Sequence, residues 1–276
     1  MPTEILGANL GHQRSAGAAS GVSMTTSSAF TPFHRGTEHI DLIPRNFSGA
    51  AVARYALCPY LVILKADSST DLAGSIADYS TIAQDGSTAT SVELSSLAAG
   101  RNVYVGSAIP FRGVHIDVDT TNSTGSTVIT VSYWNGSEWV DTSDTDGTIS
   151  GGISLAQDGA ITWTVPSAWV SSSLVKIDSS VNSSLHWRDV SMYWTKWTWD
   201  QAMDSTVTLD HMLGINESTA YAEVPASLGT GMRIHHGFGS NGIAGIETLT
   251  NAGTGNMLVT CSALNGYFST GKLTTV

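Results

Sequence analysis

Residues 127–141 read TVITVSYWNGSEWVD, and this stretch predicts a β-hairpin. The residues that precede Asn135 alternate between apolar and polar side chains, which is the pattern of a strand with one buried face. The Asn-Gly pair at 135–136 readily adopts the positive φ angles of a tight hairpin turn. The central part of the chain is therefore expected to form antiparallel β-structure.

The length of the loop decides which faces the two tryptophans of this hairpin occupy. If the Asn-Gly pair forms a two-residue loop, Trp134 pairs with Ser137 and Ser132 with Trp139, so that both tryptophans lie on one face. A one-residue bulge would reverse the faces of the return strand. The sequence leaves both registers open.

Many other short segments have the same strand-like character and are separated by Gly, Asn, Asp or Pro. They include NVYVGS, FRGVHIDVD, EWVDT, AITWTV, AYAEV, MRIHH and MLVTC, together with the longer runs AVARYALCPYLVILKA and LHWRDVSMYWTKWTW. This pattern favours an all-β fold, a β-sandwich or jelly roll with at most one or two short helices. The clearest helical candidate is TLDHMLG at 208–214, which begins with a capping threonine and ends at a glycine.

All eight tryptophans fall between Trp134 and Trp199. Residues 186–200, HWRDVSMYWTKWTWD, have an apolar residue at most positions of both strand faces. One face carries Trp187, Tyr193, Trp197 and Trp199, and the other carries Val190, Met192 and Trp194. We therefore expect this strand to be covered on both sides and Trp194 to be a core residue. The rings of the hairpin are expected to belong to the edge of the same aromatic core.

Residues 1–45 are rich in Gly, Ser, Ala and Thr without a sustained period, and they are expected to form an extended N-terminal arm. Residues 46–276 are expected to form the β-sandwich domain, with 204–276 as an alternative C-terminal extension that packs on it. The apolar residues expected to hold the arm against a partner are Leu10, Phe30, Phe33, Ile40 and Leu42.

Composition and charge exclude several classes of partner. The chain of 276 residues carries a formal net charge of −11, only 13% of its residues are charged, and lysine and arginine are not clustered. A surface that neutralises nucleic-acid phosphates is therefore not expected. The first residues contain no apolar signal region, and no later segment has the apolar length that a bilayer requires, so neither export nor membrane insertion is expected.

Three motifs resemble binding sites but have simpler interpretations. GFGSNG at 237–242 matches a dinucleotide fingerprint, but the sequence after it does not favour a helix, so we expect a turn. DTSDTDGT at 141–148, with Asp117 and Asp119 of IDVD, offers oxygen ligands for Ca²⁺; ordinary Asx-turns are the favoured alternative. The adjacent His235 and His236 would point to opposite faces of a strand and cannot share one metal ion.

The sequence contains no clear catalytic constellation. Neither a nucleophile elbow nor a metal motif of His or Cys is present, and nearly every acid lies in a turn-like context. We therefore expect no catalytic residue, no cofactor, no bound metal and no enzymatic activity. For Cys58 and Cys261 buried free thiols are expected, and a disulfide is the alternative if their two strands are neighbours.

The middle of the chain, roughly residues 102–199, resembles virion structural proteins of tailed bacteriophages. The segments that carry the resemblance are VYVGSAIPFRGVHIDVD, the YWNGSEWVD hairpin, the TDGT turn, DGAITWTVP and the strand that ends in WTKWTW. Such segments are similar to the β-sandwich or jelly-roll modules of capsid decoration, fibre and tail proteins. The hairpin also resembles a hairpin of galactose-binding-like domains, with Asn-Gly in place of Asp-Gly.

The resemblance implies two functions. The first is a capsid decoration or cement protein, made in the host cytoplasm and carried in the virion. Its expected partners are the major capsid protein and other virion proteins, and its arm and aromatic surplus favour a homo-oligomer, with a trimer as the natural closed form. The second is a tail or fibre module that binds a carbohydrate receptor; its ligand or interface aromatics would be Trp134, Trp139, Trp163 and Trp169.

Overall fold

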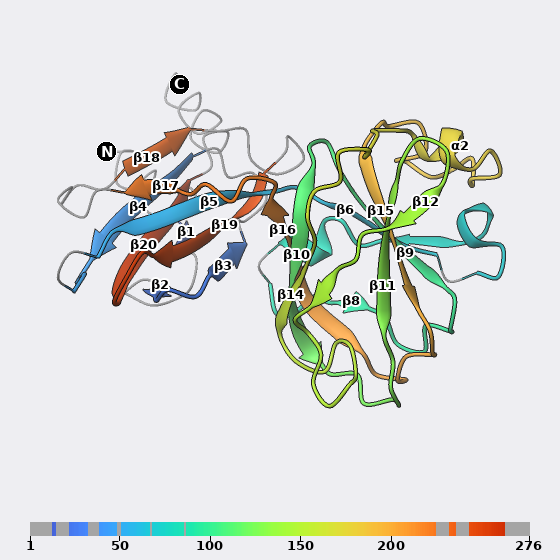
Figure 1. Ribbon diagram of the computed structural model, residues 1–276, viewed down its shortest axis with the longest axis horizontal. Coiled ribbons are helices and arrows are strands. Elements are labelled where there is room, and N and C mark those ends of the chain that lie inside the picture. Colours follow the sequence, from blue (N-terminus) through green and yellow to red (C-terminus); the bar gives the residue numbers. More distant parts are fainter. Residues whose placement is uncertain are drawn as a thin grey trace, which may run out of the picture. The chain divides into compact units, whose positions relative to one another are not determined.

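The computed structural model describes residues 13–14, 22–32, 39–48, 51–66, 68–85, 87–224, 232–235 and 243–262. Within these residues the chain is nearly all β, with four antiparallel sheets and one α-helix of four residues (Figure 1). The expected all-β fold class is confirmed. The chain divides into two compact units: unit 1 comprises Met1–Cys58 and Ser218–Val276, and unit 2 comprises Pro59–Glu217.

Unit 2 is a β-sandwich of two sheets. Its six-stranded sheet has, in spatial order, the strands β12 (Trp139–Asp141), β11 (Ile129–Trp134), β15 (Tyr193–Trp199), β9 (Asn102–Ser107), β6 (Val62–Ala66) and β7 (Ile76–Asp78). Its five-stranded sheet has the strands β13 (Thr145–Asp146), β14 (Gly159–Thr162), β10 (Phe111–Thr120), β16 (Thr208–Asn216) and β8 (Val92–Glu93). Every pairing within the two sheets is antiparallel.

The main core of unit 2 is formed by residues from both sheets. Alternate residues of the central strands contribute, such as Val103 and Val105 of β9, and Trp197 and Trp199 of β15. Phe111 is among the residues that face them from the five-stranded sheet. Both tryptophans are about 1% exposed, and each such aromatic side chain contributes a large apolar area to the core.

A second cluster covers the outer face of the six-stranded sheet. It joins Val62 and Leu64 of β6 and Trp194 of β15 to Leu174 of the helix α2 (Leu174–Ile177) and to Leu72 of the 3₁₀ turn η1 (Asp71–Ala73). A second 3₁₀ turn, η2, spans Ile82–Gln84. The central strand β15 is therefore covered on both faces, and the expected core position of Trp194 is confirmed, since this residue is 0% exposed.

Two expectations for residues 186–192 are wrong. Val190, expected on the Trp194 face, is 39% exposed, and Trp187, expected on the Trp197 face, packs against the cluster that contains Trp194. The reason is that the strand begins only at Tyr193, so the alternation of faces does not extend to these residues.

The helix expected at 208–214 is also wrong, because these residues lie in strand β16. Leu209 and Met212 both enter the main core although they are three residues apart, a spacing typical of a helix. A β-bulge explains the spacing: Asp117 pairs with His211 and Val118 with Leu209, so one residue of β16 is skipped.

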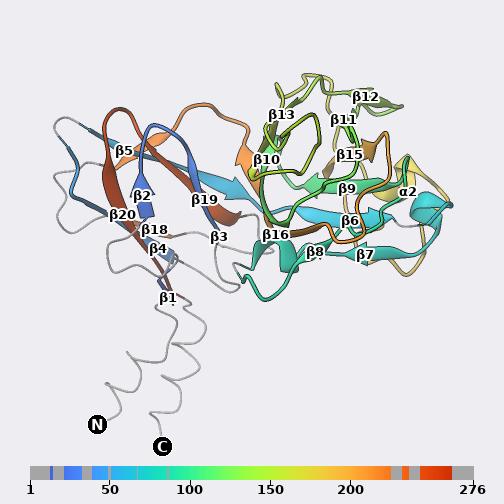
Figure 2. The ribbon, with the colours of Figure 1, turned by 90° about the horizontal axis from the view of Figure 1, so that it is seen from below.

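Unit 1 is formed by both ends of the chain. One of its sheets contains β1 (Gln13–Arg14), β2 (Val22–Met24), β20 (Gly255–Ser262), β4 (His39–Arg45) and β18 (Met232–His235). The other contains β17 (Ala222–Val224), β5 (Ala53–Pro59), β19 (Ile243–Thr250) and β3 (Ala29–Pro32). Figure 2 shows β2 and β4 beside β20, with which both are paired.

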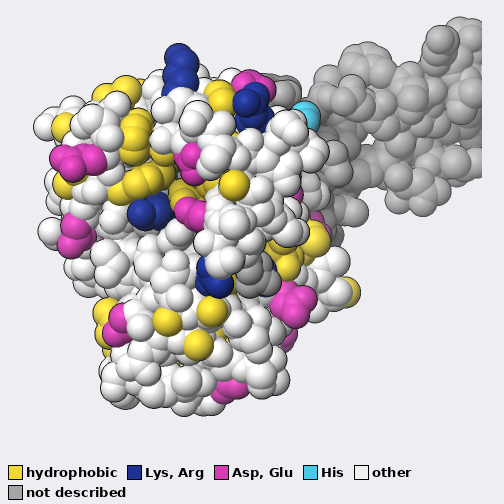
Figure 3. Space-filling model, turned by 90° about the vertical axis from the view of Figure 1, so that its right-hand side faces the viewer, with side chains coloured by type: hydrophobic (Ala, Val, Ile, Leu, Met, Phe, Trp, Pro, Cys, Tyr) yellow, Lys and Arg dark blue, Asp and Glu magenta, His cyan; other side chains and the backbone are white. Residues whose placement is uncertain are grey.

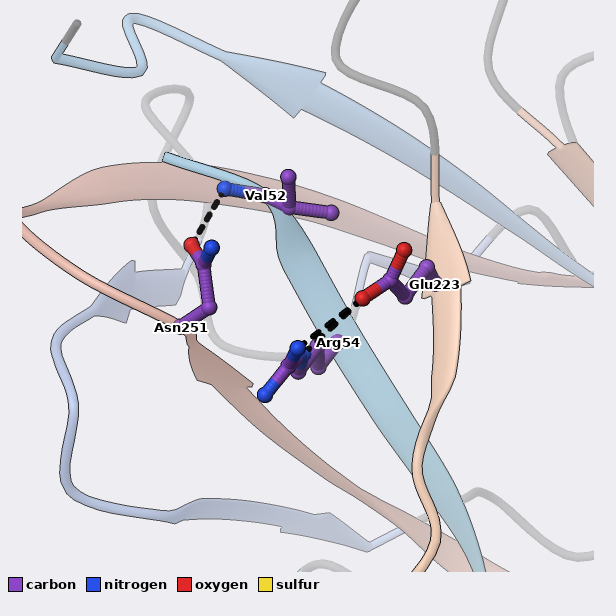
Figure 4. Close-up of polar contacts among 4 residues, drawn as sticks. All are labelled: Val52, Arg54, Glu223 and Asn251. Atoms are coloured by element: carbon purple, nitrogen blue, oxygen red, sulfur yellow. Dashed lines mark hydrogen bonds and ion pairs between the residues drawn. The ribbon is translucent and has the colours of Figure 1, made fainter. Parts of the chain in front are cut away.

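Contacts between distant segments hold unit 1 together. Among the described residues, its core includes Met24, Ile40, Leu42, Ala53, Val224, Ile246 and Met257. The backbone N–H of Val52 donates to Oδ1 of Asn251 at 2.7 Å, and Nη2 of Arg54 lies 3.0 Å from Oε1 of Glu223 (Figure 4).

The division into units differs from the expected boundary between an arm at 1–45 and a domain at 46–276. Ile40 and Leu42, expected as arm contacts, are fully buried in the core of unit 1, and Phe30 lies half-buried in β3. Leu10 and Phe33 lie outside the described residues. The expected extension at 204–276 is divided as well, because β16 belongs to unit 2 and β17 to unit 1.

Unit 2 is a continuous insertion in unit 1, and its two ends meet. A side chain at Gly214, near the end of unit 2, would place its Cβ 2.7 Å from Cγ of Pro59, the first residue of the unit. Neighbouring ends are the arrangement found where a domain is inserted in another.

Candidate functional site

The register of the hairpin places its two tryptophans directly opposite each other. Trp134 pairs with Trp139 across a four-residue loop, a register that differs from both alternatives considered from the sequence. The two rings are 5.4 Å apart and share the outer face of the six-stranded sheet, while Tyr133 and Val140 lie on the core side. Oδ1 of Asn135 accepts hydrogen bonds from the backbone N–H groups of Ser137 and Glu138, which fixes the loop.

Three of the four tryptophans named as ligand aromatics are buried. Trp134 is 8%, Trp163 6% and Trp169 7% exposed. Nε1 of Trp163 donates to the carbonyl of Phe111 and Nε1 of Trp169 to the carbonyl of Trp194, so both indoles are satisfied within the fold. Only Trp139 of these four remains half-buried, at the edge strand β12.

Trp139 lies in a partly exposed region of the outer sheet face. We call this surface the Trp139 face; it consists of Thr130, Ser132, Trp139 and Lys196. Lys196 of β15 is paired with Ser132 of β11, so the two side chains are neighbours. Thr130 is exposed, and the other three residues are half-buried.

Lys196 is the cation of this surface. Its Nζ lies over the indole of Trp139, 5.4 Å from the ring centroid, a cation–π arrangement. Burial lowers the pKa of Lys196, and the carboxylate of Asp71 opposes this effect.

A network of polar side chains lies next to Lys196 on the same sheet. Tyr104, which pairs with Lys196 across the sheet, donates its hydroxyl to Oδ2 of Asp71 at 2.6 Å. The side chain of Asn102 is near enough to Tyr104 to lower its pKa slightly, and it accepts a hydrogen bond from the hydroxyl of Thr198. Burial, followed by the interaction with Asp71, raises the pKa of Tyr104, so its hydroxyl is a proton donor at neutral pH.

Asp71 has two unusual features. Its φ angle of 49° lies in the left-handed region, which is costly for a residue other than glycine. Its Oδ1 atom is buried and has no hydrogen-bond partner, while Oδ2 is held by Tyr104. Strained backbone and unsatisfied polar atoms are found more often at functional sites than elsewhere.

Figure 3 shows a face of unit 2 on which hydrophobic, acidic and basic side chains are interspersed.

A second polar cluster lies on the five-stranded sheet. Nδ1 of His211 is 3.3 Å from Oδ2 of Asp117, and the ring of His115 is stacked at 6.2 Å from that of His211. Burial and the neighbouring His211 lower the pKa of His115 to about 4. Among the described residues, no group of three or more His, Cys, Asp or Glu side chains is arranged to hold a metal ion.

The acids considered for Ca²⁺ contact other groups of the protein, some of them within turns. Oδ1 of Asp141 accepts from the N–H of Ser143 and Oδ1 of Asp146 from the N–H of Thr148, as in Asx-turns. Oδ1 of Asp144 accepts from the N–H of Val131. Asp117 has the histidine contact given above, and Oδ2 of Asp119 accepts from the hydroxyl of Thr208.

The remaining sequence candidates fall in unit 1. Cys58 is a buried free thiol, so the alternative of a disulfide is not realised at this residue. The GFGSNG segment, His236, and the side chains of His235 and Cys261 lie outside the described part of the chain.

Sequence reasoning did not identify Lys196, Asp71 and Tyr104. The signal for Lys196 is in WTKWTW, where a lysine replaces an aromatic residue on the face that also carries Trp194. No local signal exists for Asp71, because its position depends on how η1 folds over the sheet.

None of the helices in the described residues has the length and apolar composition needed to cross a bilayer. Comparison of the chain with models of known protein families finds no match, and comparison with curated proteins finds no significant similarity.

Proposed function

We propose that the protein is a non-enzymatic structural component of a tailed-bacteriophage virion, a decoration protein of the capsid. In this proposal unit 1 attaches to the shell and unit 2 is the displayed β-sandwich. The protein is made in the host cytoplasm and is carried in the virion.

The observation that carries the proposal is the insertion of unit 2 between the two halves of unit 1. Pro59 is the first residue of unit 2 and Gly214 lies three residues before its end, so the two chain connections to unit 1 start close together. Such an arrangement suits display, since an inserted module can fold as a unit of its own while the other unit makes the attachment.

The partners proposed for unit 1 are the major capsid protein and further copies of this chain. The resemblance of residues 102–199 to phage structural modules supports the virion as the location, and a closed trimer is the proposed assembly. The net charge of −11 supports protein partners over nucleic acid.

A binding assay with purified shells of the phage that carries the gene tests this proposal. The full chain is expected to decorate the shells, whereas a fragment of residues 59–217, verified as folded by circular dichroism, is expected not to attach. Attachment of this fragment at the occupancy of the full chain would assign attachment to unit 2 and contradict the proposal. A full chain that binds no shell would rule out decoration.

The second candidate is a tail or fibre module that binds a carbohydrate receptor. One observation favours it: Trp139 is half-buried at a sheet edge beside an ammonium group, whereas the other three candidate tryptophans are buried. A partly exposed indole is the side chain on which sugar rings commonly stack.

A further inference from the structure

We infer that the Trp139 face binds a neutral pyranose ring of a glycan, which stacks on Trp139 and places its hydroxyl groups against Lys196 and Ser132. This inference rests on the second of the two functions proposed above, and it identifies the site and the class of sugar.

The indole of Trp139 supplies the apolar contact. Trp134 lies edge-on to it, Tyr104 is tilted against it at 5.7 Å, and the ammonium of Lys196 lies over one face. These neighbours fix the ring, so stacking a sugar on its remaining surface costs little side-chain entropy. The apolar C–H face of a pyranose matches such a surface.

The polar groups of the face have unused hydrogen-bonding capacity. In the described structure, neither the ammonium of Lys196 nor the hydroxyls of Ser132 and Thr130 make a hydrogen bond or an ion pair with another residue. An ammonium offers three donors, and a hydroxyl can both donate and accept. Sugar hydroxyls also donate and accept, so one pyranose can satisfy several of these groups at once.

The spacing of these groups fits one sugar ring. Ser132 and Lys196 lie opposite each other on adjacent strands, whose backbones are about 4.8 Å apart. The longer side chain of Lys196 carries its ammonium to the indole of Trp139. A pyranose that lies against Trp139 is therefore within reach of polar groups from both positions.

The network beneath Lys196 keeps the site in place. The contacts of Tyr104 with Asp71 and Asn102 hold the strand residue opposite Lys196. Asp71, which accepts the hydrogen bond of Tyr104, has a backbone conformation in the left-handed region. A site whose supporting residues are fixed before binding loses less free energy on ordering.

The local charge favours a neutral sugar. Lys196 is the one cation of the face, and Asp71 lies close enough to raise its pKa. Asp141, which is exposed, pairs with Ser132 across the hairpin and adds a second carboxylate. The carboxylate of an acidic sugar would be attracted by Lys196 but repelled by Asp71 and Asp141. The hydroxyl groups of a neutral sugar can accept hydrogen bonds from Lys196 without this repulsion.

The test uses the full chain and saturation-transfer NMR with four probes: methyl β-glucopyranoside, methyl β-galactopyranoside, methyl N-acetyl-β-glucosaminide and methyl β-glucuronide. Lys196→Met and Trp139→Ala remove the two main contacts. Lys176→Met, at an exposed lysine of α2, and Trp187→Phe, at a half-buried tryptophan outside the face, are the matched controls. Circular dichroism establishes that each variant is folded.

We expect at least one neutral pyranoside to bind, and each site variant to weaken it by about tenfold or more, as removal of a main contact does. The controls should bind like the wild type, and the glucuronide should bind more weakly than the glucoside. Lys196→Met keeps the test valid if Trp139→Ala does not fold.

Three outcomes would overturn the inference. If a sugar binds equally well to both site variants, the protein binds glycans at another surface, and the second function stands without this site. If the glucuronide binds more tightly than the neutral sugars, the sugar class is wrong. If no probe binds, the site and the carbohydrate function both fail.

Discussion

The indole ring of Trp194 lies across Gly106, the residue that pairs with it on strand β9. A Cβ atom at position 106 would be 2.5 Å from Cε3 of Trp194. Glycine is therefore required here by the ring on the next strand, since nothing in the φ angle of Gly106 demands it.

Gly106→Ala is expected to destabilise the protein by about 1–3 kcal/mol, the range typical of an overpacked core. Urea unfolding measures the change. In a Trp194→Leu background the same substitution should cost clearly less, because the ring is gone. Equal costs in the two backgrounds would mean that the ring is not the cause.

Trp194→Ala is expected to cost about 3–5 kcal/mol, as truncation of a large core aromatic does. Val190→Ala provides the comparison, since its side chain is 39% exposed and surface substitutions change stability by about 0.5 kcal/mol or less. Urea unfolding of both variants checks the prediction. A loss below about 1 kcal/mol for Trp194→Ala would contradict its core position.

Stability is expected to fall as the pH decreases from about 6.5 to about 4, because the folded state holds His115 neutral. Burial and His211 lower its pKa to about 4 in the folded protein. Between about pH 6.5 and about pH 4, His115 binds a proton in the unfolded chain but not in the folded protein. The contribution of His115 to the free energy of unfolding is therefore complete above the pKa of the unfolded state. Below that pKa it decreases by up to about 1.4 kcal/mol per pH unit.

His115→Gln should reduce this pH dependence in thermal or urea unfolding. The acids around the pair, Asp117, Asp158 and Asp210, remain in the variant, so the difference from the wild type isolates the histidine. His186→Gln, at an exposed histidine, is the control and should leave the profile unchanged. Identical profiles for wild type and His115→Gln would refute the prediction.

The thiol of Cys58 is expected to be unreactive in the folded protein. Burial, followed by the charge of Glu247, raises its pKa, and the thiolate is the reactive form. In a Cys261→Ser background, a thiol reagent should label Cys58 only after unfolding. Rapid labelling of the native protein would show that the residue is accessible.

Residues 59–217 are expected to fold in isolation. Every residue of the two hydrophobic clusters of the sandwich lies within this range, and those of the third cluster all lie outside it. The fragment should unfold cooperatively in urea, as single domains do. A complementary fragment of residues 1–58 should remain unfolded, because β4 then lacks its partner β20. A fragment 59–217 without a cooperative transition would contradict the division into units.

Local sequence patterns predicted the parts of the fold in which side chains alternate between the two faces of a strand. Both faces of Tyr193–Trp199 carry apolar residues at every second position, which predicted a strand covered on both sides. The Asn135–Gly136 pair predicted the hairpin at 127–141. The bulge at β16 was not predictable, because an extra residue in a strand produces the same three-residue spacing as a helical turn. The division into units was not predictable either, because it depends on pairing between residues far apart in the sequence.

The candidate site was predictable only in part. Trp139 was named among the ligand aromatics, but the burial of Trp134, Trp163 and Trp169 depends on segments that fold over them. Lys196 is visible in the sequence as an interruption of an aromatic face. Its electrostatic neighbour Asp71 comes from a distant turn, and no pattern within one segment connects the two.

The pairing of both chain ends in unit 1 also sets an order for folding during synthesis. The hydroxyl of Ser48 bonds the carbonyl of Thr254, 206 residues later, and β4 pairs along its length with β20. The sandwich of unit 2 is complete once Glu217 has left the ribosome, whereas β4 must wait for β18 and β20, which follow unit 2 in the sequence. At elongation rates of about 5–20 residues per second, this leaves β4 unpaired for roughly ten seconds or more, and during that time its apolar residues Ile40 and Leu42 are available to chaperones.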